Sequence, residues 1–236
     1  MRQRLLLVLV AALLAGCAGT SNDAAEPRAA ASSAKPSGFH GIEPAPVPAR
    51  PSYVLTTTEG ETFDFAAETR GRPTYVYYGY VNCADECPTA FADIAAALRK
   101  TTPELREKTR VIYVSTDAKR DTPKAVRQFL DQFSSSFIGL VGTQPELDAA
   151  ARAAGIAPGT VGPSPKALPG NPSAHEHEPG TAPHKHFGPL GYSVSHAAVI
   201  FAYDASDRLP VVYPGGVTPS EIAADLPLLA DPAGTT

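Results

Sequence analysis

The sequence predicts an α/β fold in which a mixed β-sheet is covered by helices on both faces. Short apolar segments with the composition of buried strands alternate with segments whose apolar residues recur at helical spacing. The last of these strands leads into a β-hairpin and one closing helix. Such an ending is typical of a thioredoxin-like sheet rather than a doubly wound one. One long segment rich in His, Pro and Gly interrupts the pattern.

The predicted strands are short runs of β-branched and aromatic residues that are bounded by turn residues. Gly60 lies at the turn of the first hairpin, and an Asp/Ser turn separates the strands of the last one. These runs predict strands at 53–55, 62–65, 74–78, 111–114, 138–141, 197–203 and 209–213.

The predicted helices are marked by apolar spacing and by their first residues. Segment 88–100 carries its apolar residues on one helical face. Thr122 followed by Pro123 indicates an N-cap and the first residue of a second helix. Capping boxes at 143–146 and 218–221 open two further helices.

The N-terminus has the features of a bacterial lipoprotein signal peptide, predicted at residues 1–16. A basic tip and a short apolar run end in Leu-Ala-Gly before Cys17. Acylation of Cys17 would anchor the mature chain at the extracytoplasmic face of the cell membrane. The alternative is an ordinary signal peptide followed by a chance cysteine.

The chain after Cys17 divides into a linker and one domain. Residues 17–50 are rich in Ala, Pro, Ser and Gly, which predicts a lipid-anchored flexible linker. Residues 51–232 have a length that suits a single core. The chain holds 20 Lys and Arg against 24 Asp and Glu without a basic stripe, which argues against binding of nucleic acid.

Cys83 and Cys87 follow a predicted strand and precede a predicted helix. Four residues apart in a helical turn, their sulfurs would lie on one side, and the helix N-terminus would lower both thiol pKa values. Such a pair suits Cu(I), Zn(II) or reversible disulfide formation. A permanent disulfide is the structural alternative, although so short a loop would stabilise the fold little.

His196 is the predicted third ligand because it directly precedes the apolar strand 197–203. In thioredoxin-like folds the loop before this strand lies against the helix that carries the cysteines. The alternative is an ordinary core or surface histidine. Met1 is the only methionine and leaves with the signal peptide, which excludes a methionine-based Cu(I) site.

Three segments resemble, in order, the motifs of the Sco/SenC family of copper proteins: 78–89, 114–123 and 192–196. The resemblance implies a thioredoxin fold with copper, as Cu(I) or Cu(II), held by Cys83, Cys87 and His196. It also implies a role in assembling the dinuclear copper centre of cytochrome c oxidase. The expected partners are the copper-bearing subunit of the oxidase and another extracytoplasmic copper chaperone.

The same resemblance makes Asp117 and Asp121 supporting acids, which would shape the site or a partner surface. Capping of the following helix is the alternative role. Two residues depart from the family pattern: Ala84 stands where Pro is usual, and Ser195 where Asp is usual. Neither is a ligand position, but the missing acid could change the orientation or basicity of His196.

Two functions remain open at this point. The first is a metallochaperone that delivers copper to the oxidase. The second is a membrane-anchored thiol–disulfide oxidoreductase that reduces the cysteines of an apo copper protein. Ala197 bears on this choice, because thioredoxin-type reductases usually carry a cis-proline in this loop. A peroxidase is disfavoured, because it would need a lone activated cysteine.

Residues 158–191 form a predicted flexible insert with two His-x-His units, at 175–177 and 184–186. We expect a solvated segment that is dispensable for the tight metal site. The alternative is that these histidines collect copper for the nearby His196.

Overall fold

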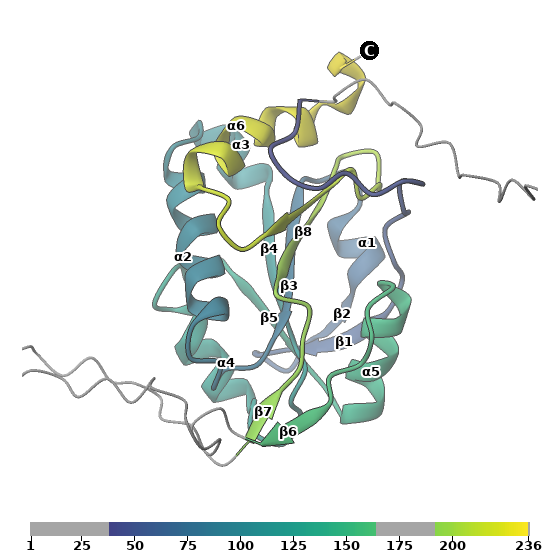
Figure 1. The fold of residues 1–236 in the computed structure, drawn as a ribbon, viewed down its shortest axis with the longest axis vertical. Helices are drawn as coiled ribbons and strands as arrows, with labels where there is room; N and C mark the ends of the chain where they lie inside the picture. Colours follow the sequence, from purple (N-terminus) through teal and green to yellow (C-terminus); the bar gives the residue numbers. More distant parts are fainter. Residues whose placement is uncertain (1–37, 164–191, 236) are drawn as a thin grey trace, which may run out of the picture. The chain divides into compact units, whose positions relative to one another are not determined.

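The computed structural model describes residues 38–163 and 192–235 and contains a seven-stranded mixed sheet (Figure 1). The strand order is β2-β1-β5-β4-β3-β8-β9, and β3–β4 and β4–β5 are parallel while the other pairs are antiparallel. The strands are β1 Val54–Thr57, β2 Thr62–Asp64, β3 Thr74–Gly79, β4 Arg110–Ser115, β5 Ile138–Val141, β8 Val199–Tyr203 and β9 Val211–Pro214. The predicted thioredoxin-like fold class is confirmed.

Helices cover both faces of the sheet, so that a separate core forms on each side (Figure 1). Residues of α2, α4 and α6 form one core, and residues of α1 and α5 contribute to the other. The helices are α1 Phe65–Thr69, α2 Glu86–Arg99, α3 Pro103–Lys108, α4 Pro123–Leu130, α5 Gln144–Ala153 and α6 Pro219–Ala230, followed by the 3-10 helix η2 Pro232–Thr235.

Strand β3 is buried on both sides and leads directly to the predicted metal site. Its side chains alternate, so that Tyr75 and Tyr77 enter one core while Val76 and Tyr78 enter the other. The parallel pairing of β3 with β4 brings the ends of both strands, Gly79 and Ser115, side by side. Two motifs distant in the sequence therefore meet at one end of the sheet.

Three of the four predicted helix starts are confirmed, while α2 begins at Glu86, two residues before the predicted 88. Thr122 accepts a hydrogen bond from the backbone N–H of Ala125, and both capping boxes are formed, at Thr143 and at Thr218. Helices α1 and α3 were not predicted, because each is only five or six residues long and has no apolar periodicity.

The predicted linker is wrong for its described part, because residues 38–50 belong to the folded domain. We call this segment the strap. Its backbone pairs with β9 through Ile42 and Val212, and the side chain of Arg50 is buried. Arg50 donates hydrogen bonds to Asp207, Thr69 and two backbone carbonyls. Composition did not reveal this segment, because backbone pairing and charged contacts attach it more than apolar burial does.

The predicted insert also begins too early. Strand β6, Val161–Pro163, pairs with β7, Tyr192–Val194, in a two-stranded antiparallel sheet. Both His-x-His units lie outside the described residues, as do the signal peptide and Cys17. Within 38–163 and 192–235, every helix is too short or too polar to cross a membrane.

Candidate metal centre

Cys83 and Cys87 lie where the chain turns from β3 into α2. The backbone N–H of Cys83 donates to the carbonyl of Tyr80 at 3.0 Å, which closes the turn. Cys87 lies in the first turn of α2, and its N–H points at the Cys83 sulfur at 3.5 Å. Cys83 itself precedes the helix, so that a tight turn, and not a helical turn alone, places the sulfurs on one side.

His196 completes a cluster of three donor atoms. Its Nε2 lies 3.5 Å from the Cys87 Sγ and 4.0 Å from the Cys83 Sγ. All three donor atoms lie within 4.8 Å of one another. A metal bound at about 2.3 Å by sulfur and about 2.05 Å by nitrogen holds S and N about 3.6–3.8 Å apart. The donors are therefore spaced to hold one ion with little movement.

The imidazole ring of His196 is oriented by the backbone. Its Nδ1 lies 3.2 Å from the carbonyl oxygen of Val194, to which Nδ1–H donates. This leaves the lone pair of Nε2 directed at the sulfurs, as a metal ligand requires. Ser195, which stands where the motif usually has an acid, instead binds Thr160 at 2.7 Å. A backbone carbonyl thus supports the histidine without that acid.

Comparison with known proteins places this site in a family. The family model described as SCO1/SenC matches residues 43–163, about half of the chain, including both cysteines. The chain belongs to the SCO1/SenC family. His196 lies beyond the matched residues, and its assignment depends on the geometry above together with the motif resemblance.

Members of the SCO1/SenC family resemble the chain over different lengths. Protein SenC of Rhodobacter capsulatus is 40% identical over 82 residues, which are 35% of this chain and 37% of SenC. The chain spans less than half the length of the curated relatives that it matches first.

Two solved structures share the fold over most of the chain. Copper-bound ScoI of Bradyrhizobium japonicum is 25% identical with a TM-score of 0.58, covering 77% of this chain and 99% of its own. A SCO1/SenC family lipoprotein of Bacillus anthracis is 19% identical with a TM-score of 0.53, covering 76% and 93%.

The two thiols of this SCO1/SenC site differ in acidity. The hydrogen bond from the Cys87 thiol, together with that from His196, lowers the pKa of Cys83 to about 4 against the effect of burial. Burial and the neighbouring Cys83 sulfur raise the pKa of Cys87. The predicted direction of the pKa shift is therefore right for Cys83, although hydrogen bonds from Cys87 and His196 cause it, and wrong for Cys87, where burial dominates. In the absence of metal, the pair carries one thiolate and one proton.

The pKa of His196 is also shifted. Burial alone would lower it, but the hydrogen bond and the charge of Cys83 outweigh that effect and raise it. Cys83 and His196 thus stabilise each other's charged forms. The raised pKa means that protons compete with a metal for Nε2 up to a higher pH than they would at a free imidazole.

Asp121 and Asp117 support the site from the second SCO1/SenC motif. Asp121 is buried and accepts hydrogen bonds from the backbone N–H of Val81 at 3.0 Å, from Tyr113 and from Ser115. It therefore fixes the turn two residues before Cys83. Helix α4 is capped by the side chain of Thr122, so that the site-shaping role, and not capping, fits Asp121.

Asp117 acts one step further from the donors. It forms an ion pair with Arg120, whose guanidinium lies 5.3 Å from the ring centre of Tyr80. The Tyr80 ring in turn packs edge-to-face on His196, with centroids 5.4 Å apart. A chain of contacts thus connects this acid to the orientation of the imidazole.

Tyr77, Tyr80 and Gly79 were not predicted as site residues. The Tyr77 hydroxyl lies 3.4 Å from His196 Nε2. A Cβ atom on Gly79 would come within 2.7 Å of the Cys87 Sγ, so that only glycine leaves room for this sulfur. The available signal was position: Tyr77 and Gly79 lie at the end of β3, and Tyr80 directly follows it, before the cysteine turn.

Proposed function

We propose that this protein binds one copper ion through Cys83, Cys87 and His196 and carries it to the dinuclear copper centre of cytochrome c oxidase. The observation that carries the proposal is the convergence of two thiol sulfurs and one oriented imidazole nitrogen within 4.8 Å. Two thiolates suit soft Cu(I), and an added imidazole allows Cu(II) to bind. Membership of the SCO1/SenC family and the shared fold with copper-bound ScoI support this choice of metal.

Different residues of the site contribute to binding and to release of copper. Cys83 offers a thiolate without prior loss of a proton, while Cys87 must release its proton when the ion enters. The raised pKa of His196 makes protons compete with the ion for its Nε2. Asp121 and the Val194 carbonyl hold the cysteine turn and the imidazole in place. Because uptake releases protons, return of protons to Cys87 and His196 favours transfer to a client's ligands.

A thiol–disulfide oxidoreductase is the second candidate function, and the split acidity of the two thiols favours it. The Cys83 thiolate would attack a client disulfide and displace one client thiolate. Cys87, after losing its proton, would then attack Cys83 in the mixed disulfide. The client would gain two electrons and two protons and leave as a dithiol, and this chain would be left oxidised, with a Cys83–Cys87 disulfide.

The experiment that tests copper binding is anaerobic titration of the mature chain with Cu(I) and Cu(II) in competition with chelators. We expect one tight ion per chain. His196→Ala should weaken Cu(II) by more than about tenfold and Cu(I) less, because thiolates alone suit Cu(I). Equal Cu(II) affinity in wild type and His196→Ala would contradict the proposed ligand set and favour the oxidoreductase.

We also propose that acylated Cys17 holds the chain on the extracytoplasmic face of the membrane. The Leu-Ala-Gly-Cys sequence supports this, and a SCO1/SenC family lipoprotein shares the fold. Cys17→Ser should leave the protein unprocessed or release it from the membrane fraction. An acylated, membrane-bound mature form of this variant would contradict the anchor.

A further inference from the structure

Glu86 lies next to the nitrogen donor of the centre, outside the cluster of three donor atoms. It is the first residue of α2 and is placed between the two cysteines in sequence. Its Oε2 lies 3.9 Å from His196 Nε2, and its side chain is 61% exposed while that of His196 is 7% exposed. The exposed carboxylate is therefore free to rotate towards an ion held by the nitrogen donor.

We infer that the Glu86 carboxylate is a fourth ligand that binds copper only in the Cu(II) state; this inference rests on the proposed function. Cu(I) is satisfied by soft thiolates, with or without the imidazole. Cu(II) prefers tetragonal sets with N and O donors, and the cluster of two sulfurs and one nitrogen provides no oxygen. Glu86 can provide that oxygen from a side chain already next to the nitrogen donor.

The other oxygen atoms near the centre are less suited to this role. The Tyr77 hydroxyl is 3.4 Å from Nε2, but a phenol keeps its proton at neutral pH and is a weak ligand. The Asp121 carboxylate is buried and already accepts three hydrogen bonds that hold the cysteine turn. Glu86 is the acid whose exposure leaves it able to move.

Glu86 has two other possible effects that do not require ligation. An acid in the first turn stabilises a helix through its dipole, and its charge attracts a cation from a distance. Neither effect distinguishes a ligand from any nearby charge. Asp85 provides the matched comparison, because it is the exposed N-cap residue next to Glu86 and its side chain makes no capping hydrogen bond.

The test compares wild type, Glu86→Gln and Asp85→Asn in the full mature chain. Each of the two variants removes one negative charge. Copper itself is the probe, with Cu(II) affinity, Cu(I) affinity, the Cu(II) electron paramagnetic resonance spectrum and the sulfur-to-Cu(II) absorption as readouts. Glu86→Gln should weaken Cu(II) by about tenfold or more and alter both spectra, with Cu(I) affinity within about twofold. Asp85→Asn should keep the wild-type spectra and both affinities.

The outcomes separate this inference from the proposed function. Unchanged Cu(I) affinity shows that Glu86→Gln is folded with its sulfurs in place. Suppose that wild type binds copper, and that both variants keep its spectra or lower the Cu(II) affinity equally. Glu86 is then not a ligand, while the proposed copper site is unaffected. If wild type binds neither Cu(I) nor Cu(II), the proposed function is overturned and the inference with it.

Discussion

At the scale of single residues, the metal centre depends on Gly79 as well as on its donor residues, because Gly79 has no side chain. The space that a Cβ would occupy is filled by the Cys87 Sγ and by the ring of Tyr77, at 2.7 and 3.0 Å. Both neighbours are buried and held by β3 or α2, so neither can retreat at low cost. One position therefore couples the strand's packing to the sulfur's location.

Gly79→Ala should consequently displace the Cys87 sulfur. We expect Cu(I) affinity to fall by about tenfold or more. The free energy of unfolding of the apo protein should fall by about 1–3 kcal/mol, because an extra methyl group overpacks the core. Chelator competition and urea unfolding measure the two effects. Gly215→Ala is the control, because a Cβ there meets no atom within 4 Å. Wild-type copper affinity in Gly79→Ala would contradict the close-packing argument.

At the scale of elements, the strap depends on Arg50 and on His40, which attach its two ends. The Arg50 side chain is 3% exposed and donates to Asp207, Thr69 and the carbonyls of Arg72 and Asp204. Burial lowers the pKa of Arg50, with Asp207 opposing the effect, and the group remains charged. Its contacts are therefore hydrogen bonds of a buried cation.

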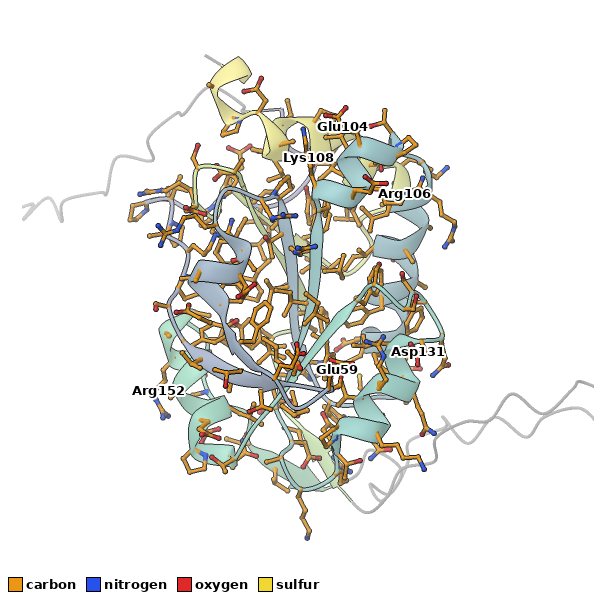
Figure 2. All side chains as sticks on the ribbon, turned by 180° about the vertical axis from the view of Figure 1, so that it is seen from behind. Glu59, Glu104, Arg106, Lys108, Asp131 and Arg152 are labelled. Carbon is orange, nitrogen blue, oxygen red and sulfur yellow. The ribbon has the colours of Figure 1, made fainter. Side chains whose placement is uncertain are left out.

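Arg50→Ala should lower the free energy of unfolding by about 3 kcal/mol, because it removes the charged hydrogen bonds of a buried guanidinium to Asp207, to Thr69 and to the carbonyls of Arg72 and Asp204. Urea unfolding measures this loss, and limited proteolysis should detect faster cleavage within 38–50. Arg152→Ala on α5 is the control, since Arg152 is exposed (Figure 2). Equal stability of the two variants would contradict this role.

His40 makes the other end of the strap sensitive to pH. Its hydrogen bond to Asp225 and the charge of that acid raise the pKa of His40. A raised histidine pKa adds stability that is complete below the unfolded value of about 6.5 and is lost as pH rises through the folded value. Wild type should therefore exceed His40→Ala in free energy of unfolding by more at about pH 5.5 than at about pH 9.

A double-mutant cycle identifies the partner of His40. In Asp225→Asn, the pH-dependent part of the His40→Ala effect should vanish, because the amide carries no charge. If that part persists in the Asp225→Asn background, another group is responsible for the raised pKa.

The elements also show which features the sequence could predict. Long or capped elements such as α2, α5 and α6 were predicted because periodicity and capping boxes are local signals. The strap and the β6–β7 pair were missed because partners distant in the sequence stabilise them, and α1 was missed because it is too short to show periodicity. Among site residues, the two cysteines and His196 carry visible donor chemistry. Gly79 and Tyr80 act through packing, for which the only signal in the sequence is their position before the cysteine turn.

At the scale of the whole molecule, copper and a disulfide compete for the same two sulfurs. Cys83 and Cys87 are not joined by a disulfide in the structure, and their sulfurs lie within 4.8 Å of each other. A disulfide would bring them to about 2.05 Å and remove both thiolates from metal binding. The oxidation state of the pair should therefore decide whether the domain can be loaded.

We expect copper content and free thiol content to rise and fall together. Mature protein oxidised with a mild disulfide reagent should bind no tight Cu(I), and reduction should restore one ion per chain. Thiol titration and metal analysis on the same samples measure both quantities. Tight Cu(I) binding by fully oxidised protein would place the ion elsewhere, for example on the His-x-His units at 175–177 and 184–186.

The pairing of the strap with β9 has a further consequence, for self-association. Strand β9 is the last strand of the sheet, and Ile42 covers part of its outer edge through two backbone hydrogen bonds of 2.8 Å with Val212. An uncovered edge strand offers its N–H and C=O groups to a second chain. A version of the protein that begins at residue 51 would expose this edge. It should form dimers or aggregates in light scattering, where the chain that begins at residue 18 stays monomeric.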